Sequence, residues 1–403
     1  MANTLLTISM ITREALRILE NNLKLTGRLS RKYDPKFGIE GAKIGTALNI
    51  RKPPRYVGTS GQALSVEDST ESQVTLNLST QFHVDIQFSS ADLGLSIDNF
   101  SDRFLKPAIA TIANRIDFDS AALYRQVYNN VGTAGTVPTT LETYLQAGQK
   151  LDEEAAPMDG MRTMCVNPAM QVQIVNALRA LFQSATAIAK QYMTGHMGTA
   201  IGFEWVMDQN IRTHTIGVLG GTPLVNGASQ TGSSLITDGW TAAAATRVLQ
   251  GDVFTMTSVN AVNPQNRQNT GDTRDFVVTA DTASDASGNM TIPISPSITP
   301  GASAQFRTVT QSPADNAALT FGTASTATPQ GLAFHRDWAT MAMADLPLPG
   351  GVDKAARVSD DQLGVSMRMV RAYDINSDQW PCRIDVLYGH LGLYNELCAR
   401  VQS

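Results

Sequence analysis

The segment VTLNLSTQFHVDIQF, from Val74 to Phe88, alternates apolar and polar residues, which is the signature of a β-strand with one buried face. The segment from Ile44 to Arg55 has a similar strand signature, and a polar, glycine-containing stretch from Thr59 to Ser72 separates the two. We therefore predict a long two-stranded projection with a mobile tip. An isolated ribbon of this kind is only marginally stable in water, so we expect it to rest on a partner.

Helical periodicity is found on both sides of this ribbon. Apolar residues at steps of three and four predict an amphipathic helix from Ile8 to Leu23, which Gly27 can end in a left-handed cap. A charged, proline-containing segment from Arg31 to Phe37 follows, so this helix is expected to be an arm joined to the body by a loop. A second helix is predicted from Ser101 to Asn130. Pro107 either opens this helix or kinks it, and the pattern does not choose between the two.

The middle of the chain has a mixed pattern of helices and strands. We predict a helix from Leu141 to Glu154, a short strand from Thr163 to Val166 and, after the Asn167-Pro168 turn, a helix from Ala169 to Phe182. Strand-like alternation returns at Phe203, Trp205 and Met207.

The composition changes abruptly near Gly220. From there to about Thr328 the sequence is rich in Thr, Ser, Ala, Gly and Asn, which predicts an inserted β-rich domain. Its strand signatures lie at Val253 to Val259, Phe276 to Ala280 and Met290 to Ile294. The turn signal DASGN, from Asp285 to Asn289, separates the last two. After the insertion, the alternating residues from Val365 to Tyr388 predict two strands around a polar turn.

Length and composition exclude several classes of protein. At roughly one domain per 150 residues, 403 residues predict two or three domains. Charged residues make up 17%, below the usual share of about one quarter; extensive contact with other subunits is one explanation for this, but not the only one. The net charge of -5 argues against a dedicated nucleic-acid-binding protein, because phosphate neutralisation needs clustered Lys and Arg.

Cysteine and hydropathy patterns give further exclusions. Cys165, Cys382 and Cys398 are odd in number and lack C-x2-C spacing, so neither a disulfide framework nor a zinc site is predicted. The sequence has no signal-peptide pattern and no run approaching the roughly 20 apolar residues of a membrane span. We expect a soluble protein that is not exported and has no membrane partner.

No constellation typical of catalysis or of a cofactor is found in the sequence. The five histidines lack H-x3-H and HExxH spacing, and G-x4-G-K-[ST] and G-x-S-x-G motifs are absent. Asp117 and Asp119 are two residues apart on a predicted helix and do not face one another, so we expect them to be solvated or at an interface. Asp281 and Asp285 lack the pattern of a calcium loop. We predict no catalytic residue, no cofactor and no metal, and hence no enzyme.

Several segments resemble one protein family. They are Asp98 to Arg103 with Ile112 to Asn114, Asn167-Pro168 with Gly202-Phe203, Gly251 to Phe254 with Val259 to Gln265, Phe276 to Ala280, and Phe334 to Asp337 with Pro381 to Gly389. Spread along nearly the whole chain, they resemble the coat protein family of phage P22, which belongs to the larger HK97-like capsid fold.

The resemblance implies an α+β, HK97-like capsid fold with an inserted all-β barrel. The implied segments are an N-terminal arm (1–43), an extended loop with peripheral-domain strands (44–94), a peripheral-domain spine helix (95–135), an axial domain (136–219), the inserted barrel (220–328) and a return to the axial and peripheral domains (329–403). The extended loop would lie over a neighbouring subunit.

The function implied by the resemblance is that of a major capsid protein, which assembles into the icosahedral head of a tailed bacteriophage. Copies would form hexamers and pentamers around double-stranded DNA without sequence-specific binding, with a scaffolding protein and a portal protein as partners. Assembly would take place in the host cytoplasm, and the product would be the virion. Glu14 and Glu20 are candidate contacts to a basic scaffold segment or to a subunit, with a solvated helix face as the alternative.

A second hypothesis comes from another class of protein. β-rich domains with many Thr, Ser and Asn residues commonly bind sugars through exposed aromatic side chains, so the chain is alternatively a receptor- or glycan-binding virion protein. Trp240 is the only tryptophan of the insertion, which is thin support for this alternative.

Overall fold

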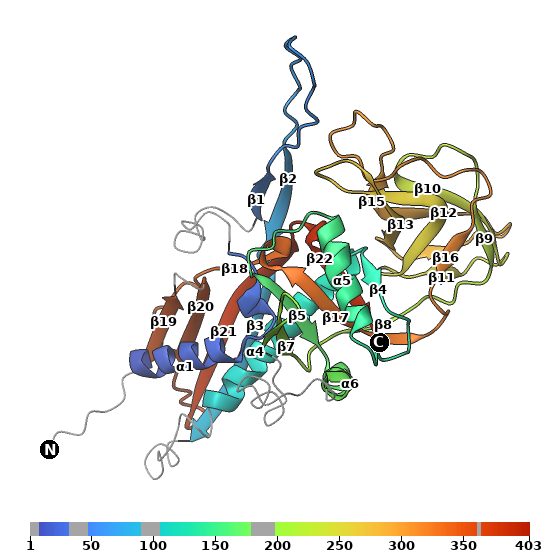
Figure 1. Ribbon diagram of the computed structural model, residues 1–403. Coiled ribbons are helices and arrows are strands. Elements are labelled where there is room, and N and C mark those ends of the chain that lie inside the picture. Colours follow the sequence, from blue (N-terminus) through green and yellow to red (C-terminus); the bar gives the residue numbers. More distant parts are fainter. Residues whose placement is uncertain (1–7, 32–46, 90–104, 179–197, 361–363) are drawn as a thin grey trace. The chain divides into compact units, whose positions relative to one another are not determined.

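The computed structural model describes residues 8–31, 47–89, 105–178, 198–360 and 364–403 (Figure 1). Contacts divide the chain into two compact units. Unit 1 comprises residues 1–52, 73–120 and 339–393, and unit 2 comprises residues 53–72, 121–338 and 394–403. The chain therefore passes between the units several times. Among the described residues, no helix is long and apolar enough to span a membrane.

Unit 1 is built on a five-stranded antiparallel sheet. Its strands are β3 (Thr80–Ser89), β18 (Ala339–Met343), β19 (Lys354–Asp360), β20 (Val365–Arg371) and β21 (Gln379–Gly392). The long strand β21 pairs with β3 from Gln379 to Tyr388 and with β18 from Tyr388 to Gly392. β20 and β21 are the two strands predicted around the polar turn, and this prediction is confirmed.

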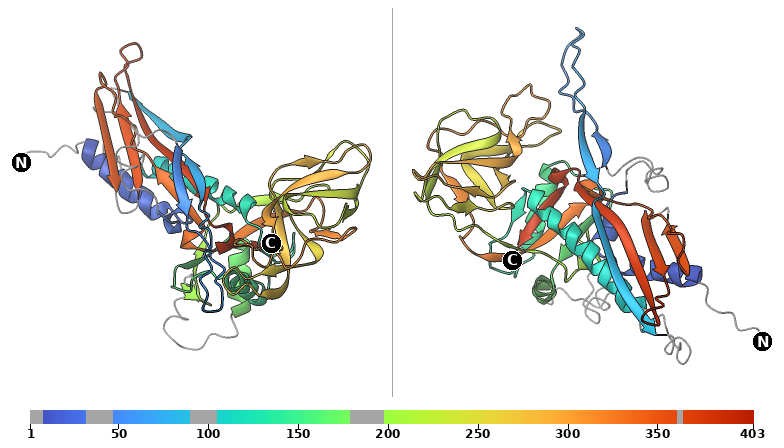
Figure 2. Two further views of the ribbon diagram at one scale, coloured as in Figure 1. Left: turned by 90° about the horizontal axis from the view of Figure 1, so that it is seen from above. Right: turned by 180° about the vertical axis from the view of Figure 1, so that it is seen from behind.

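Two helices cover this sheet, α1 (Ile8–Asn22) and α4 (Lys106–Ala121), as Figure 2 shows from two sides. Their apolar faces share one core with the sheet because residues at steps of three and four lie on one side of a helix. That core contains Ala15, Leu16, Leu19, Leu23, Ile109, Ile112, Ile116, Met341, Val365, Met367, Ile384 and Val386. The helix predicted at the N-terminus is confirmed, and its apolar face is buried within unit 1.

The predicted ribbon forms in part. β1 (Ala47–Lys52) pairs with β2 (Ser72–Asn77), but the alternating segment then continues as a separate strand, β3, in the main sheet. The prediction of a single strand from Val74 to Phe88 was therefore wrong. The physical reason lies at Leu76 and Leu78, which are buried in a small second cluster with Ala342 and Ala344 instead of joining the main core. Residues 44–46 lie outside the described residues.

The ends predicted for α1 and α4 both differ from those in the structure. Gly27 does not form a left-handed cap; it lies within the 3-10 turn η1 (Thr26–Arg28). Pro107 is the second residue of α4, in the first turn where a missing N–H costs no hydrogen bond, so it opens the helix. α4 ends at Ala121 and continues as the 3-10 helix η3 (Ala122–Gln126), so the predicted end at Asn130 was wrong. Residues 101–104 lie outside the described part.

Unit 2 contains a mixed seven-stranded sheet. Its strands are β4 (Asn130–Val131), β5 (Arg162–Val166), β6 (Thr199–Ala200), β7 (Phe203–Met207), β8 (Thr213–Thr215), β17 (Ala327–His335) and β22 (Cys398–Gln402). β5 and β7 run parallel, and all five residues of β5 are buried, as expected of an inner parallel strand. The predicted strands at β5 and β7 are confirmed.

Two helices accompany this sheet, α5 (Glu142–Glu153) and α6 (Pro168–Leu178). Both were predicted from the sequence. Residues 179–182 of the second predicted helix lie outside the described residues. α5 packs on β22 and β17, and Tyr144, Ala147 and Leu151 on its inner face are buried. The short 3-10 helices η5 (Arg336–Trp338) and η6 (Asn395–Leu397) complete this region.

The insertion forms a six-stranded antiparallel sheet in the order β16-β12-β13-β15-β10-β9, with a separate β11–β14 pair. Its strands are β9 (Gly221–Val225), β10 (Gly232–Trp240), β11 (Thr246–Val248), β12 (Val253–Val262), β13 (Asn269–Val278), β14 (Thr282–Ala283), β15 (Met290–Ile298) and β16 (Leu319–Phe321). The three predicted strand signatures fall within or overlap β12, β13 and β15. At the predicted turn, the Asp285 carboxylate accepts hydrogen bonds from the Ser287 and Asn289 backbone N–H groups, at 2.7 and 2.8 Å.

The edge strands β9 and β16 of this sheet meet each other. Leu224 forms an isolated bridge with Ala318, and the Val225 backbone N–H donates to the Ala317 carbonyl at 3.0 Å. The insertion also has its own apolar core, in which the Phe254 ring stacks on Phe276 and Phe321. Edge strands that pair leave few open backbone groups, which discourages pairing with other chains.

Candidate assembly surfaces

The segment from residue 53 to residue 72, called the loop tip below, leaves β1 and returns to β2. Its side chains Leu64, Val66 and Tyr56 are 91%, 81% and 59% exposed. The loop is nevertheless ordered by its own contacts, because the Glu67 carboxylate accepts hydrogen bonds from the backbone N–H groups of Val57 and Gly58, at 2.8 and 2.6 Å. A projecting loop that exposes large apolar side chains is typical of a protein-binding surface.

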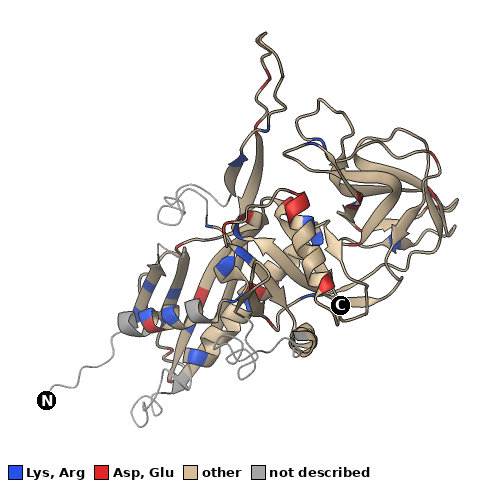
Figure 3. Ribbon diagram, in the orientation of Figure 1, with Lys and Arg blue, Asp and Glu red and all other residues tan. Residues whose placement is uncertain are grey.

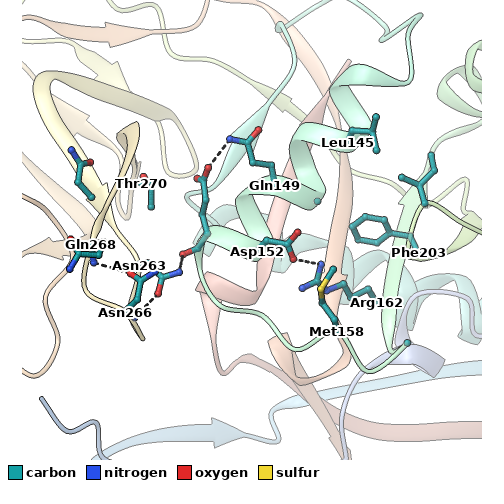
Figure 4. A pocket seen from close by; sticks show the side chains of 16 residues that line it. Leu145, Gln149, Asp152, Met158, Arg162, Phe203, Asn263, Asn266, Gln268 and Thr270 are labelled. Carbon is teal, nitrogen blue, oxygen red and sulfur yellow. Dashed lines mark hydrogen bonds and ion pairs between the residues drawn. The ribbon is translucent and has the colours of Figure 1, made fainter. Parts of the chain in front are cut away.

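A groove of about 850 Å³ lies between α5 and the turn that joins β12 to β13 (Figure 4). Apolar side chains from Leu145, Met158 and Phe203 and several amide side chains line it. Its charges are satisfied locally: Arg162 pairs with Asp152 at 2.8 Å, and the Gln149 amide donates to Glu153 at 2.7 Å. Both carboxylates therefore have polar partners within unit 2.

A buried ion pair joins the insertion to helix α5. The guanidinium of Arg274, in β13, contacts the Glu154 carboxylate at the end of α5, and both side chains are at least 92% buried. The Tyr128 ring lies 4.5 Å from the Arg274 guanidinium. Burial lowers the pKa of Arg274, but the charge of Glu154 and the hydroxyl of Tyr128 raise it more, so the net pKa lies above its ordinary value. The arginine therefore stays charged.

A second buried network involves His214. The Tyr124 hydroxyl lies 3.0 Å from its Nδ1 atom, and an Asp252 carboxylate oxygen lies 2.8 Å from its Nε2 atom. Asp252 also accepts a hydrogen bond from the Leu249 backbone N–H at 2.8 Å. All three side chains are buried and none lines the groove, so this network ties η3 and β8 to the start of β12 rather than serving a substrate.

The two aspartates of α4 have structural roles that the sequence did not reveal. Asp117 is 1% exposed, and its carboxylate accepts hydrogen bonds from the Lys24 and Thr26 backbone N–H groups, at 2.7 and 2.9 Å. Asp119 binds Arg115 at 2.9 Å and accepts a hydrogen bond from Tyr388 at 2.8 Å. The expectation that both are solvated or at an interface was wrong for Asp117, which holds the segment after α1 on α4.

The aromatic residue that would support sugar binding is buried. Trp240 is 4% exposed, and its indole N–H donates to the Thr237 hydroxyl at 2.9 Å. Its ring packs against Phe321 in the core of the insertion. Trp240 therefore has no free face on which a sugar ring can stack. Within the described residues, no group of three His, Cys, Asp or Glu side chains is arranged to hold a metal ion.

Comparison with known protein families gives the decisive observation. The family described as "P22 coat protein - gene protein 5" matches residues 10–398, which is nearly the whole chain. The chain belongs to the P22 coat protein family. It is a major capsid protein that forms the head of a bacteriophage.

Solved capsid structures are similar to this coat protein. A structure of Mycobacterium phage Che8 is 11% identical, with 93% of this chain and 89% of that chain covered and a TM-score of 0.47. The capsid of the cyanophage P-SCSP1u is 10% identical, with 89% and 83% covered and a TM-score of 0.44. The CUS-3 coat protein I-domain is 24% identical over 25% of this chain and 94% of its own, with a TM-score of 0.19. No curated protein sequence matches the chain.

The predicted scaffold contacts of the coat protein lie on α1. Glu14 forms an ion pair at 2.9 Å with Arg17, one turn away, on the exposed face of the helix. Glu20 belongs to α1, but its side chain lies outside the described residues. Figure 3 shows basic and acidic residues alternating along α1 and α5. Because Glu14 already has a cationic neighbour, its attraction for a basic partner is weakened, and the scaffold role of both residues stays a prediction.

One histidine gives the coat protein a pH-dependent stability. Burial lowers the pKa of His390 from 6.5 to about 4, while Asp119 raises it and Arg31 lowers it further. In the unfolded chain the imidazole takes up a proton near pH 6.5, but in the folded chain only near pH 4. Unfolding therefore binds a proton between these values, and stability falls as the pH is lowered, by about 1.4 kcal/mol per unit.

We expect His390→Gln to remove this dependence, because glutamine can still bond to the Ser120 hydroxyl, which lies 2.6 Å from the imidazole. Urea unfolding of the unassembled subunit at pH 6.5 and pH 5 measures the effect. The loss of stability between these two values should be about 1.5 kcal/mol smaller in the variant than in the wild type. Equal losses in the two proteins would show that folding does not hold His390 in its neutral form.

Proposed function

We propose that this coat protein folds in the HK97-like manner, with α4 as the spine helix of a peripheral domain and the insertion closed as a β-barrel. The meeting of β9 and β16 through Leu224 and Ala318 supports the closed barrel, because it joins the two ends of the six-stranded sheet. The division at residues 43, 94, 135, 219 and 328 belongs to the same proposal. The single core shared by α1, α4 and the sheet of unit 1 supports a common peripheral domain.

Copies of the coat protein assemble into hexamers and pentamers through unlike patches on neighbouring subunits. A closed ring of identical subunits requires such heterologous contacts, in which one surface of a subunit meets a different surface of the next. The observation that supports this proposal is the exposure of two large apolar side chains, Leu64 and Val66, in the loop tip. It lies over the neighbouring subunit and buries these side chains there.

The further partners are a scaffolding protein, a portal protein and enclosed double-stranded DNA. The net charge of -5 suits a shell that encloses DNA without binding particular sequences. Cys165, Cys382 and Cys398 are all buried thiols, which suits assembly in a reducing host cytoplasm before the virion is released. α1, with Glu14 and Glu20, is the surface we assign to the scaffold. The shell itself needs no catalytic activity.

Co-expression of the coat protein with and without its candidate scaffold tests this proposal. Sedimentation should give one fast, uniform species when both proteins are present, and a mixture of subunits and irregular particles when the scaffold is left out. A folded protein that forms only trimers and is retained by immobilised glycans would contradict the proposal and support a receptor-binding role.

A further inference from the structure

Both legs of the loop tip contact other segments of unit 2. On the outgoing leg, Arg55 forms an ion pair with Glu396 at 2.8 Å, and its guanidinium lies 5.6 Å from the centre of the Phe306 ring. On the returning leg, the Gln305 amide donates to the Asp68 backbone carbonyl at 2.5 Å. Two adjacent residues of the insertion, Gln305 and Phe306, therefore contact the two legs of one loop.

Among the described residues, the rest of the loop tip makes few contacts that would hold its orientation. Gly58 and Gly61 have positive φ angles, and an added Cβ atom at either position would have no neighbour within 4 Å. The bonds from Glu67 to Val57 and Gly58 join the two legs to each other, but they do not join the loop to anything else. The orientation of the exposed Leu64 and Val66 thus depends on the contacts at the base.

Arginine side chains hold the segment that contacts the loop tip. Gln305 and Phe306 lie in the segment between β15 and β16, and this segment is held by arginines of the insertion. Arg267 donates to the Ala302 carbonyl at 2.8 Å and to the Ala304 carbonyl at 2.6 Å, and Arg307 donates to the Val309 carbonyl at 3.2 Å. Side chains that bond to backbone carbonyls help to fix this segment in place.

We infer that the β15–β16 segment of the insertion is a support that orients the loop tip for docking onto a second copy of the chain. Arg55, Gln305, Phe306 and Glu396 are its positioning residues. The inference rests on the proposed function, because the docking partner is the neighbouring subunit. It gives the insertion a role in directing assembly from within its own subunit. Orienting the loop in advance reduces the entropy that docking would otherwise lose.

A distance measurement between two spin labels tests the orienting role in the unassembled subunit. One label replaces Ala63 in the loop tip and the other replaces Ser234 in β10, as Ala63→Cys and Ser234→Cys; both positions are exposed, whereas the native cysteines are buried. We expect a single narrow distance distribution in this parent protein. Arg55→Ala with Phe306→Ala should broaden it about twofold or more, because the loop then samples several orientations.

Two further variants make the result specific. Glu396→Gln removes the charge that holds Arg55 but keeps the shape of the side chain, and it should broaden the distribution as well. Arg336→Ala, an exposed arginine of the same unit, should leave it unchanged. Equal widths in the parent protein and in the Arg55→Ala/Phe306→Ala variant would overturn the inference, provided that thermal unfolding shows both to be folded.

Comparing shell assembly by the wild type and by the Arg55→Ala/Phe306→Ala variant tests this inference separately from the proposed function. A broadened distribution together with normal shells would overturn the role in assembly but leave the capsid function intact. Slow or irregular assembly of the broadened variant, with a normal wild type, is the expected result. If the wild type itself formed no shells, the proposed function would fail, while the distance distributions would still test whether the support orients the loop.

Discussion

Replacement of Arg274 by methionine is expected to lower the free energy of unfolding of the subunit by about 3–5 kcal/mol. The reason is that Glu154 is buried and would lose its cationic partner, leaving a charge in an apolar environment. The Tyr128 ring, stacked 4.5 Å from the guanidinium, would lose its contact too. Urea unfolding of the unassembled subunit, followed by tryptophan fluorescence, measures this loss.

The double variant Arg274→Met with Glu154→Leu separates the ion pair from simple packing. A buried ion pair can often be replaced by apolar side chains at little cost, so the double variant should recover most of the stability that the single variant loses. As a matched control, Arg357→Met removes a surface partner of Asp345 and should cost no more than about 1 kcal/mol. A small effect of Arg274→Met, within that of Arg357→Met, would disprove the importance of the buried pair.

Introduction of two carboxylates at the loop tip should abolish shell formation. Leu64→Asp with Val66→Asp places charges where two apolar side chains are to be buried by the neighbouring copy, and burying an unpaired charge costs several kcal/mol. The cost recurs in every copy of a shell. Since both side chains are exposed in the subunit, its own stability should change by no more than about 0.5 kcal/mol. Sedimentation of the assembled particles provides the measurement.

Thr59→Asp is the control for charge alone, because it adds a carboxylate to a polar position of the same loop. We expect shells from this variant. Normal shells from the Leu64→Asp/Val66→Asp variant would mean that the loop tip does not dock through these side chains. Failure of that variant to fold, detected by its thermal unfolding, would place the two residues in the subunit core, contrary to their exposure.

The sequence predicted elements whose residues lie close together along the chain. The alternation from Val365 to Tyr388 identified β20, the turn and β21, because a hairpin needs only local information. The apolar face of α1 was found in the same way. The strand from Val74 to Phe88 was predicted as one element because the alternation does not change phase at Leu78. Only the separate core formed with Ala342 and Ala344 divides it.

Long-range partners could not be predicted from one sequence. Glu154 and Arg274 are 120 residues apart, and nothing in the spacing of either residue indicates that they meet. The bonds from Lys24 and Thr26 to Asp117 could not be predicted either, because a carboxylate on a helix is more often solvated than buried. These bonds also remove the need for a left-handed Gly27, because the first residues after α1 are held by another helix. The contacts of Arg55 with Glu396 belong to the same class.

Electron microscopy of particles purified after co-expression of the wild-type chain with its scaffold tests whether this chain builds the phage head. We expect closed icosahedral shells whose hexamers and pentamers are built from copies of this chain. Soluble, folded protein that remains as small oligomers, with binding to the scaffold verified independently, would contradict it.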